Sequence, residues 1–404
     1  MDNNNNNNFD RDKAFEELFS DNEERDYTYE RERKSYNRSN AMRRAKSRRN
    51  NAKKIVLMTV IAVLLVALWI VAAVAIWRGV FGVETPDGEA GTSAGDETSS
   101  DIGSGEEDQG GDGQGDGEGG QTQGVSFVTV TKGANDYKYG KLILINHAYK
   151  YDQAGDSTLN GELVSVFNYA NGSFYVTRLA DQLRMDTVTA MNNMFAAFKA
   201  ETGLGGYCIR DYYAWCTTQD QEKWFKDTEV KYGAGAVRHE FKAGESEHEA
   251  GRTFDLKVDV DREGAAGAVF IGVAAETEPK YAWIYDNCYK YGIIDRYPAG
   301  KENITGVSMA ETSIHSDHFR FVGIPAATAM HNNDWCLEEF IIEIQKYTYN
   351  GEHLKVEDST GVKYEMYYYP AEIGSQTEVK VPEGAKYDIS GNNVDGYIVT
   401  ITVE

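Results

Sequence analysis

The feature that most constrains this chain is an uncharged, strongly apolar run, IVLMTVIAVLLVALWIVAAVAIW, from Ile55 to Trp77. Its length matches the ~20 apolar residues that an α-helix needs to cross a hydrocarbon core ~30 Å thick. A cleaved signal peptide has an apolar stretch of only ~7–15 residues close to the start of the chain, so this run is too long and begins too late. The run therefore predicts one transmembrane helix at residues 55–77.

The charges on the two sides of this run predict its orientation. The segment before it, RRAKSRRNNAKK at residues 43–54, is densely basic, whereas the segment after it has Arg78 and then becomes acidic. Cytoplasmic flanks of membrane spans collect lysine and arginine. We therefore expect a single-pass protein of the cell membrane, with its N-terminus in the cytoplasm and everything after Phe81 outside.

Composition separates two further segments that flank the run. Residues 1–54 open with asparagines and carry mixed charge with few aliphatic side chains, so they bury too little surface to fold and are expected to be a disordered cytoplasmic tail. Residues 78–124 form an acidic, glycine-rich linker that has no lysine or arginine from Gly82 to Gly124. Such a composition behaves as a flexible, self-repelling coil, and we expect a tether that holds a domain away from the membrane.

Folded character begins at Val125. The segments VSFVTVT, at residues 125–131, and KLILINHAY, at residues 141–149, have the β-branched composition and alternation of strands. Apolar side chains at helical spacing predict an amphipathic helix at residues 183–200 and two more at residues 280–291 and 337–345. These segments predict a domain that contains both strands and helices.

The end of the chain differs from the middle. After about residue 350, short alternating apolar segments are joined by glycine and asparagine turns. We therefore predict a main domain at residues 125–350 and a small C-terminal β appendage at residues 351–404.

Charge and cysteine content exclude several classes of protein. The 64 acidic and 41 basic residues give a formal net charge of −23, which disfavours a nucleic-acid-binding protein because phosphate contact requires a basic face. The four cysteines are too few and too scattered for a disulfide scaffold; they are Cys208, Cys216, Cys288 and Cys336. Free buried thiols and one or two bridges both remain open, with free thiols preferred.

Three candidate metal ligands lie in two polar stretches flanked by glycines. GESEHEAGRTFDLKV, at residues 244–258, holds His248 and Asp255, and ETSIHSDHFRFVG, at residues 311–323, holds His318. On adjacent strands these three side chains would supply three ligands and leave a fourth tetrahedral position open for water, as in a catalytic zinc site. Spacing alone favours the simpler interpretation of two ordinary loop histidines and an aspartate at a strand end.

A resemblance to a known family changes that balance. SEHEAGRTFD, at residues 246–255, resembles the S-E-H-x-x-G-x-A-x-D signature of VanY-like D-alanyl-D-alanine carboxypeptidases. The likeness extends over roughly residues 142–345 and continues in four more segments in the family's order: YGIIDRYP at 291–298, GKE at 300–302, ITG at 304–306 and HFRFVG at 318–323.

The resemblance implies a zinc-dependent enzyme with the α+β fold shared by hedgehog-type domains and D,D-peptidases. It implies that His248, Asp255 and His318 hold Zn²⁺. The implied partner is a peptidoglycan stem peptide ending in D-alanine, from which the enzyme removes C-terminal residues, and both D,D and L,D specificity remain open.

The chain departs from the family pattern at two motifs. The substrate-carboxylate motif S-G-Y-R-S is represented by YCIRD at residues 207–211, in which Arg210 offers a bidentate fork to a carboxylate, with Ser246 as a second substrate contact. The family's general base is a glutamate in E-x-W-H, and the corresponding stretch here is HSDH, in which His315 replaces the glutamate.

Two functions therefore follow from the sequence. The first is a membrane-anchored, extracytoplasmic zinc carboxypeptidase with His315 in the catalytic position. The alternative is a weak or inactive pseudoenzyme that binds cell-wall peptides or a partner, because loss of a general base costs roughly 10²–10⁴-fold in rate. A serine D,D-peptidase is disfavoured, since no serine is followed by lysine in an S-x-x-K motif.

Overall fold

A computed structural model describes residues 126–210, 213–232, 241–260, 267–307 and 317–403. The predicted cytoplasmic tail, transmembrane helix and linker lie outside these residues, so these three assignments stay predictions. Among the described residues, no helix combines the length and apolar character that crossing a membrane requires.

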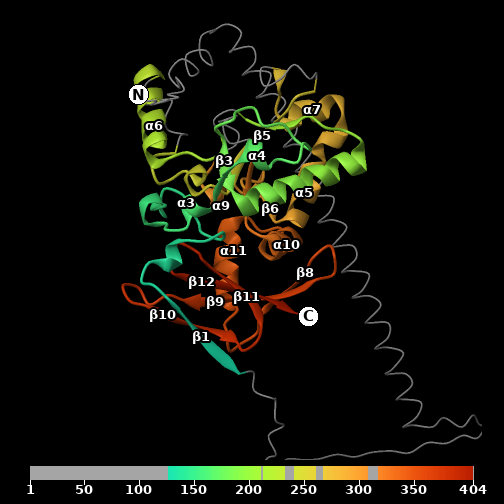
Figure 1. The fold of residues 1–404 in the computed structure, drawn as a ribbon. Helices are drawn as coiled ribbons and strands as arrows, with labels where there is room; N and C mark the ends of the chain where they lie inside the picture. Colours follow the sequence, from blue (N-terminus) through green and yellow to red (C-terminus); the bar gives the residue numbers. More distant parts are fainter. Residues whose placement is uncertain (1–125, 211–212, 233–240, 261–266, 308–316, 404) are drawn as a thin grey trace, which may run out of the picture. The chain divides into compact units, whose positions relative to one another are not determined.

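A four-stranded antiparallel sheet forms the centre of the domain (Figure 1). Its order is β4 (Tyr207–Ile209), β5 (Thr253–Val258), β7 (His318–Phe321) and β6 (Ile293–Asp295). The two strands expected around the candidate ligands are thus neighbours at the middle of the sheet. Their register places Asp255 directly opposite His318.

One long helix, α5 (Met185–Thr202), supplies much of the core of this sheet. Met191, Met194 and Phe195 lie on its buried side and pack with strand residues that include Phe254. The helix ends at Gly203, whose φ of 73° is a left-handed conformation that glycine adopts without strain. The predicted helix at residues 183–200 is confirmed, with its start two residues later.

The predicted helix at residues 280–291 is instead three successive helical turns. They are η6 (Pro279–Ala282), α8 (Trp283–Asn287) and η7 (Cys288–Tyr291). Asn287 breaks the helix because its φ of −129° lies outside the α region, while its side-chain amide donates to the carbonyl of Trp283. The apolar spacing in this segment does mark buried side chains, since Ile284 and Cys288 are buried in the same core as α5.

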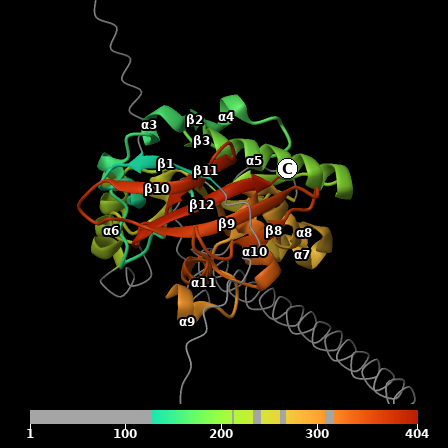
Figure 2. The same cartoon turned by 90° about the horizontal axis from the view of Figure 1, so that it is seen from below.

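The C-terminal strands predicted after residue 350 are present and form a second antiparallel sheet. Its order is β11 (Lys386–Gly391), β12 (Gly396–Val403), β9 (Lys363–Pro370) and β8 (Leu354–Glu357). The remaining strand, β10 (Thr377–Pro382), pairs antiparallel with β1 (Phe127–Lys132) (Figures 1 and 2). The strand expected near residues 125–131 therefore exists, but its pairing partner is a strand from the C-terminal part of the chain.

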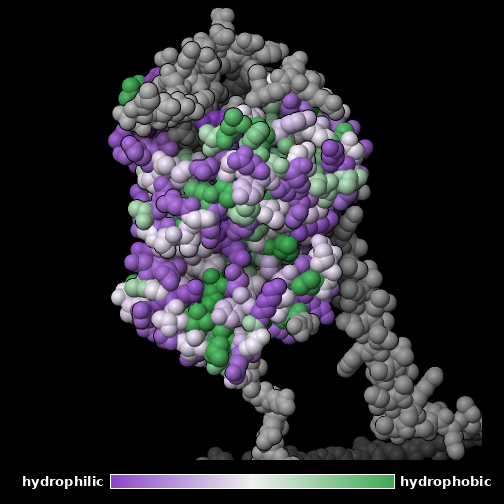
Figure 3. Space-filling view, viewed as in Figure 1, coloured by the Kyte–Doolittle hydropathy of each residue, from purple (hydrophilic) through white to green (hydrophobic). Residues whose placement is uncertain are grey.

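The C-terminal sheet also shares a core with the main domain. Met366 and Ile398 pack with apolar side chains of α10 (Ile324–Asn333) and α11 (Leu337–Glu343). The described residues from 351 to 403 are thus packed against the helices that follow β7, although the exact boundary at residue 351 stays a prediction. On the face in Figure 3, polar side chains cover most of the described surface and apolar ones form small separate patches, as expected when cores hold the larger apolar side chains.

The segment KLILINHAY, at residues 141–149, is not a strand, which corrects the prediction. Residues 142–145 are buried, but their backbone bonds go to other partners. The N–H of Leu144 donates to the carbonyl of Asn392, and the carbonyl of Ile143 accepts from Arg320. The apolar composition of this segment reflects burial rather than sheet pairing.

The other described elements are short connections apart from α6. They are α3 (Leu159–Glu162), β2 (Leu163–Ser165), α4 (Val166–Tyr169), β3 (Gln182–Arg184), α6 (Thr218–Tyr232), α7 (Ile271–Thr277), α9 (Glu302–Thr305), and the 3-10 turns η1 (Asp136–Lys138), η2 (Gln153–Gly155), η4 (Glu247–Ala250) and η9 (Ile344–Lys346). The preferred interpretation of the cysteines is confirmed, because all four are buried and none of them forms a disulfide bond.

The shared core predicts that the C-terminal sheet and the main domain unfold together. Ile398→Ala removes a fully buried side chain and should lower the free energy of unfolding by about 2–5 kcal/mol within one cooperative urea transition. Val403→Ala, at the 36% exposed end of the same strand, is the matched control and should cost less than about 0.5 kcal/mol. A loss confined to a separate, earlier transition would contradict the shared core.

Candidate metal centre

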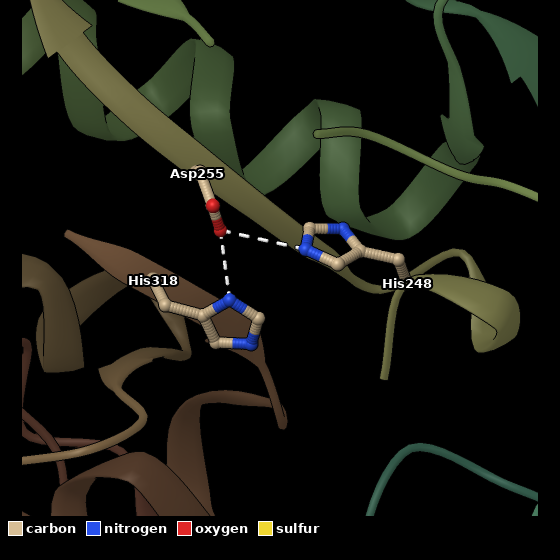
Figure 4. A group of neighbouring side chains, drawn as sticks. All are labelled: His248, Asp255 and His318. Atoms are coloured by element: carbon tan, nitrogen blue, oxygen red, sulfur yellow. Dashed lines mark hydrogen bonds and ion pairs between the residues drawn. The ribbon is translucent and has the colours of Figure 1, made fainter. Parts of the chain in front are cut away.

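The structure brings the three predicted metal ligands together in one buried cluster (Figure 4). His248 comes from η4, Asp255 from β5 and His318 from β7. One ligand atom from each side chain lies within 4.8 Å of the others. The expectation that adjacent strands would join these residues is therefore confirmed for Asp255 and His318, whereas His248 reaches the cluster from a 3-10 turn.

Local backbone conformation explains how the first two ligands reach the cluster. Turn η4 ends at Gly251, whose φ of 71° is in the left-handed region. A Cβ atom at this position would stand 3.0 Å from Cδ2 of Leu163, so a larger residue would meet both strain and crowding. The glycine of the motif therefore lets the chain turn from His248 into β5 and Asp255.

A second left-handed residue, Asp317, directs the third ligand. Its φ is 62°, and its carboxylate accepts the backbone N–H of Ile271 at 2.8 Å and the hydroxyl of Tyr285. Aspartate is one of the few non-glycine residues that enter this region readily. These bonds hold the chain at the point where β7 begins with His318.

The distances define which atoms face one another. Nδ1 of His318 lies 2.7 Å from Oδ1 of Asp255, and Nε2 of His248 lies 3.5 Å from the same oxygen (Figure 4). Nδ1 of His248 is 2.8 Å from the carbonyl of Ala214. Because a carbonyl only accepts, we assign the ring proton of His248 to Nδ1, which leaves the lone pair of Nε2 directed toward Asp255.

The electrostatics of the cluster favour an ionised carboxylate. Burial alone would raise the pKa of Asp255, but the neighbouring His318 and His248 outweigh it and hold that pKa well below its usual range. Burial alone would lower the pKa of His318, but Asp255 and then Glu247 raise it to about 9. In the absence of a metal, the ring of His318 is therefore cationic at neutral pH, with a proton on each of its two nitrogens.

A buried ionic network surrounds His318 on its other side. Oε1 of Glu247 accepts from Nε of Arg296 at 2.7 Å and from Nη1 of Arg320 at 2.5 Å. Arg296 also forms a bidentate pair with Glu338 of α11, at 2.9 and 2.6 Å. Burial would raise the pKa of Glu247, yet the two guanidinium groups hold it far below its usual range. Sequence reasoning missed this network, although three of its members lie inside the matched motifs.

Arg210, the predicted carboxylate clamp, lies at the edge of the cluster. Its backbone N–H donates to the carbonyl of Asp255 at 2.9 Å, and its Nη1 lies 3.9 Å from Oδ2 of the same residue. Its guanidinium carbon stands 4.0 Å from the ring centre of Tyr213 and 5.6 Å from that of Phe270. The side chain is 21% exposed, so it combines a fixed, aromatic-supported position with access from solvent.

The two other predicted site residues have different outcomes. Ser246 is buried and precedes η4, where its carbonyl accepts the N–H of Glu249. It is therefore a neighbour of the cluster in the chain, and its substrate contact stays a prediction. His315 lies outside the described residues, so its proposed place as the base stays a prediction as well.

The donor set fits Zn²⁺. Two imidazole nitrogens and one carboxylate oxygen are typical zinc ligands, whereas Ca²⁺ and Mg²⁺ prefer oxygen ligands only. Oδ2 of Asp255 is buried and makes no hydrogen bond to any described residue. A buried carboxylate oxygen without such a bond is costly, and a bound cation would offset that cost.

Comparison with known proteins agrees with this geometry. Residues 180–324 match the D-alanyl-D-alanine carboxypeptidase (VanY) family. A D-alanyl-D-alanine carboxypeptidase of Enterococcus faecium is 27% identical over 273 residues, which cover 65% of this chain and 75% of that protein. The putative carboxypeptidase YodJ of Bacillus subtilis is 31% identical over 170 residues, which cover 41% of this chain and 55% of that protein.

The fold also has a solved relative. The structure of the vancomycin-resistance D,D-dipeptidase VanXYg, in complex with a D-Ala-D-Ala phosphinate analogue, aligns with a TM-score of 0.56 and 24% identity over 69% of this chain and all of that chain. This likeness shows the fold, a mixture of helices and strands that agrees with the predicted α+β class. The region that carries the His248, Asp255 and His318 cluster, residues 180–324, is therefore a domain of the VanY D-alanyl-D-alanine carboxypeptidase family.

Proposed function

We propose that this protein is a zinc-dependent carboxypeptidase that removes C-terminal D-alanine from peptidoglycan stem peptides. The observation that carries the proposal is the buried cluster of two histidines and one aspartate, with ligand atoms within 4.8 Å of one another and an arginine beside it. Family membership and the activity named for the Enterococcus faecium relative support the same reaction.

Each residue of the site has a distinct task in this proposal. His248, Asp255 and His318 hold Zn²⁺, which when bound supplies the Lewis acidity that polarises a peptide carbonyl. Arg210 binds the terminal carboxylate of the peptide through its planar fork, and the ring of Tyr213 at 4.0 Å keeps that fork oriented. Ser246 is the second residue that contacts the substrate peptide in this proposal.

We also propose that the domain acts outside the cell, anchored through residues 55–77. The apolar run, the basic segment before it and the acidic tether after it support this placement. Stem peptides are wall components, so an extracytoplasmic domain on a flexible tether would reach them. Both D,D and L,D specificity remain compatible with the site.

One observation favours a second candidate function. His315 occupies the position where the family signature has its glutamate base. A protein that retains the metal cluster but lacks an efficient base would bind wall peptides and cleave them slowly. This pseudoenzyme is the alternative that the experiments below separate from a working carboxypeptidase.

Zinc binding should be coupled to proton release. Because the pKa of His318 is raised to about 9 without metal, Zn²⁺ must displace a proton from this ring at neutral pH. Zinc affinity should therefore rise about tenfold per pH unit between pH 7 and 8.5, with about one proton released per zinc. Calorimetry in buffers of different ionisation enthalpy measures both, and a pH-independent affinity in this range would contradict the assignment.

Loss of a ligand should remove both metal and activity. His248→Ala should abolish stoichiometric zinc binding and lower D-alanine release from a stem pentapeptide by more than ~100-fold, because fewer than three ligands remain. Elemental analysis and mass spectrometry of the peptide measure the two effects. His353→Ala is the matched control, since His353 pairs with Glu365 in the C-terminal sheet, and it should change neither quantity. Full activity in the His248 variant would exclude the proposed site.

The identity of the base should limit the rate. His315→Glu restores the family residue and should raise D-alanine release from the pentapeptide at least tenfold, equivalent to ~1.4 kcal/mol of barrier. The measurement is kcat at saturating peptide with zinc present. If the unsubstituted protein already cleaves the pentapeptide efficiently and His315→Glu lowers its activity, His315 is instead a working base.

A further inference from the structure

His318 lies between two buried carboxylates. Its Nδ1 is 2.7 Å from Oδ1 of Asp255, and its Nε2 is 3.6 Å from Oε2 of Glu247. All three side chains are nearly inaccessible to solvent. The two nitrogens of one imidazole ring therefore face different acids, one inside the metal cluster and one outside it.

Glu247 is held in place through its other oxygen. Oε1 accepts from both Arg296 and Arg320, whereas Oε2 makes no hydrogen bond to any described residue. A shift of about 0.6 Å would bring Oε2 and Nε2 of His318 to the ~3.0 Å of an N–H···O hydrogen bond. The carboxylate thus presents one fixed acceptor to the outer edge of the ring.

We propose that Glu247 is a positioning residue that accepts the Nε2 proton of His318 and so leaves Nδ1 as the nitrogen that faces the metal. The inference rests on the zinc site of the proposed function. Metal-binding histidines commonly donate their second N–H to a carboxylate, and this bond fixes the tautomer and the ring orientation.

The chain geometry makes this role specific. Glu247 and His248 are consecutive residues of η4, so one turn controls two ligands. His248 directs its own nitrogen to Asp255, while Glu247 reaches His318 from the opposite side. The bidentate pair between Arg296 and Glu338 ties the same network to α11, which keeps Glu247 from rotating away.

Glu247→Gln is the most informative change because it preserves shape and alters one atom. The single amide oxygen would be taken by Arg296 and Arg320, which can only donate. The amide NH₂ would then face Nε2 of His318 and favour the tautomer with its proton on Nδ1. That tautomer cannot offer Nδ1 to a metal.

The test compares zinc affinities of the full-length protein by competition with a chromogenic chelator. Glu247→Gln should weaken zinc binding ten- to a hundredfold, the range typical for loss of such a partner. The matched control is Asp156→Asn, which makes the same chemical change at another buried carboxylate paired with an arginine, Arg184, and should stay within about threefold. Thermal unfolding of both variants without zinc confirms that each is folded.

A second measurement needs no variant. A crystal structure of the zinc-loaded protein should show zinc on Nδ1 of His318 and Nε2 within ~3.0 Å of Oε2 of Glu247. Zinc on Nε2, or unchanged affinity in a folded Glu247→Gln variant, would overturn the inference while leaving the zinc site intact. An original protein that binds no zinc would overturn both, and the chelator assay detects that outcome before any variant is compared.

Discussion

The pairing of β5 with β7 is the constraint on which the site depends. In its register Asp255 stands opposite His318, and side chains opposite one another on antiparallel strands have Cβ atoms ~4.5–5.5 Å apart. That spacing suits two ligands of one metal ion. A slip of one residue in this pairing would move His318 to the other face of the sheet. The backbone hydrogen bonds between β5 and β7 therefore determine the geometry of the site as much as the identity of the ligands does.

The buried acids beside the cluster are balanced by different partners. Two acids, Glu247 and Asp255, are out of contact with water beside the histidines, and burial of unpaired charge is costly. Arg296 and Arg320 balance Glu247, whereas Asp255 is balanced by the imidazoles and, in the proposed function, by the metal. The cluster therefore has the charge and donor atoms that suit a cation, and two guanidinium groups fix Glu247 beside it.

The cluster could be predicted from the sequence because its signals are local. Spacing alone favours two ordinary loop histidines, but the resemblance of SEHEAGRTFD and HFRFVG to the family motifs identifies His248, Asp255 and His318 without knowledge of the tertiary structure. The ionic network could not be predicted, since Glu247 lies 49 residues from Arg296 and 73 from Arg320 and only folding brings them together. The pairing of β1 with β10 could not be predicted for the same reason, because the two strands lie at opposite ends of the folded region. KLILINHAY was misread because apolar composition reports burial and does not reveal hydrogen-bond partners.

In the proposed function His248, Asp255 and His318 hold one zinc ion through nitrogen and oxygen atoms only. Zinc K-edge X-ray absorption of the purified full-length protein measures the atoms bound to the metal. We expect about one zinc per chain, with all zinc–ligand distances at ~2.0–2.2 Å. A sulfur ligand at ~2.3 Å, which would implicate one of the four buried cysteines, or the absence of stoichiometric zinc, would contradict it.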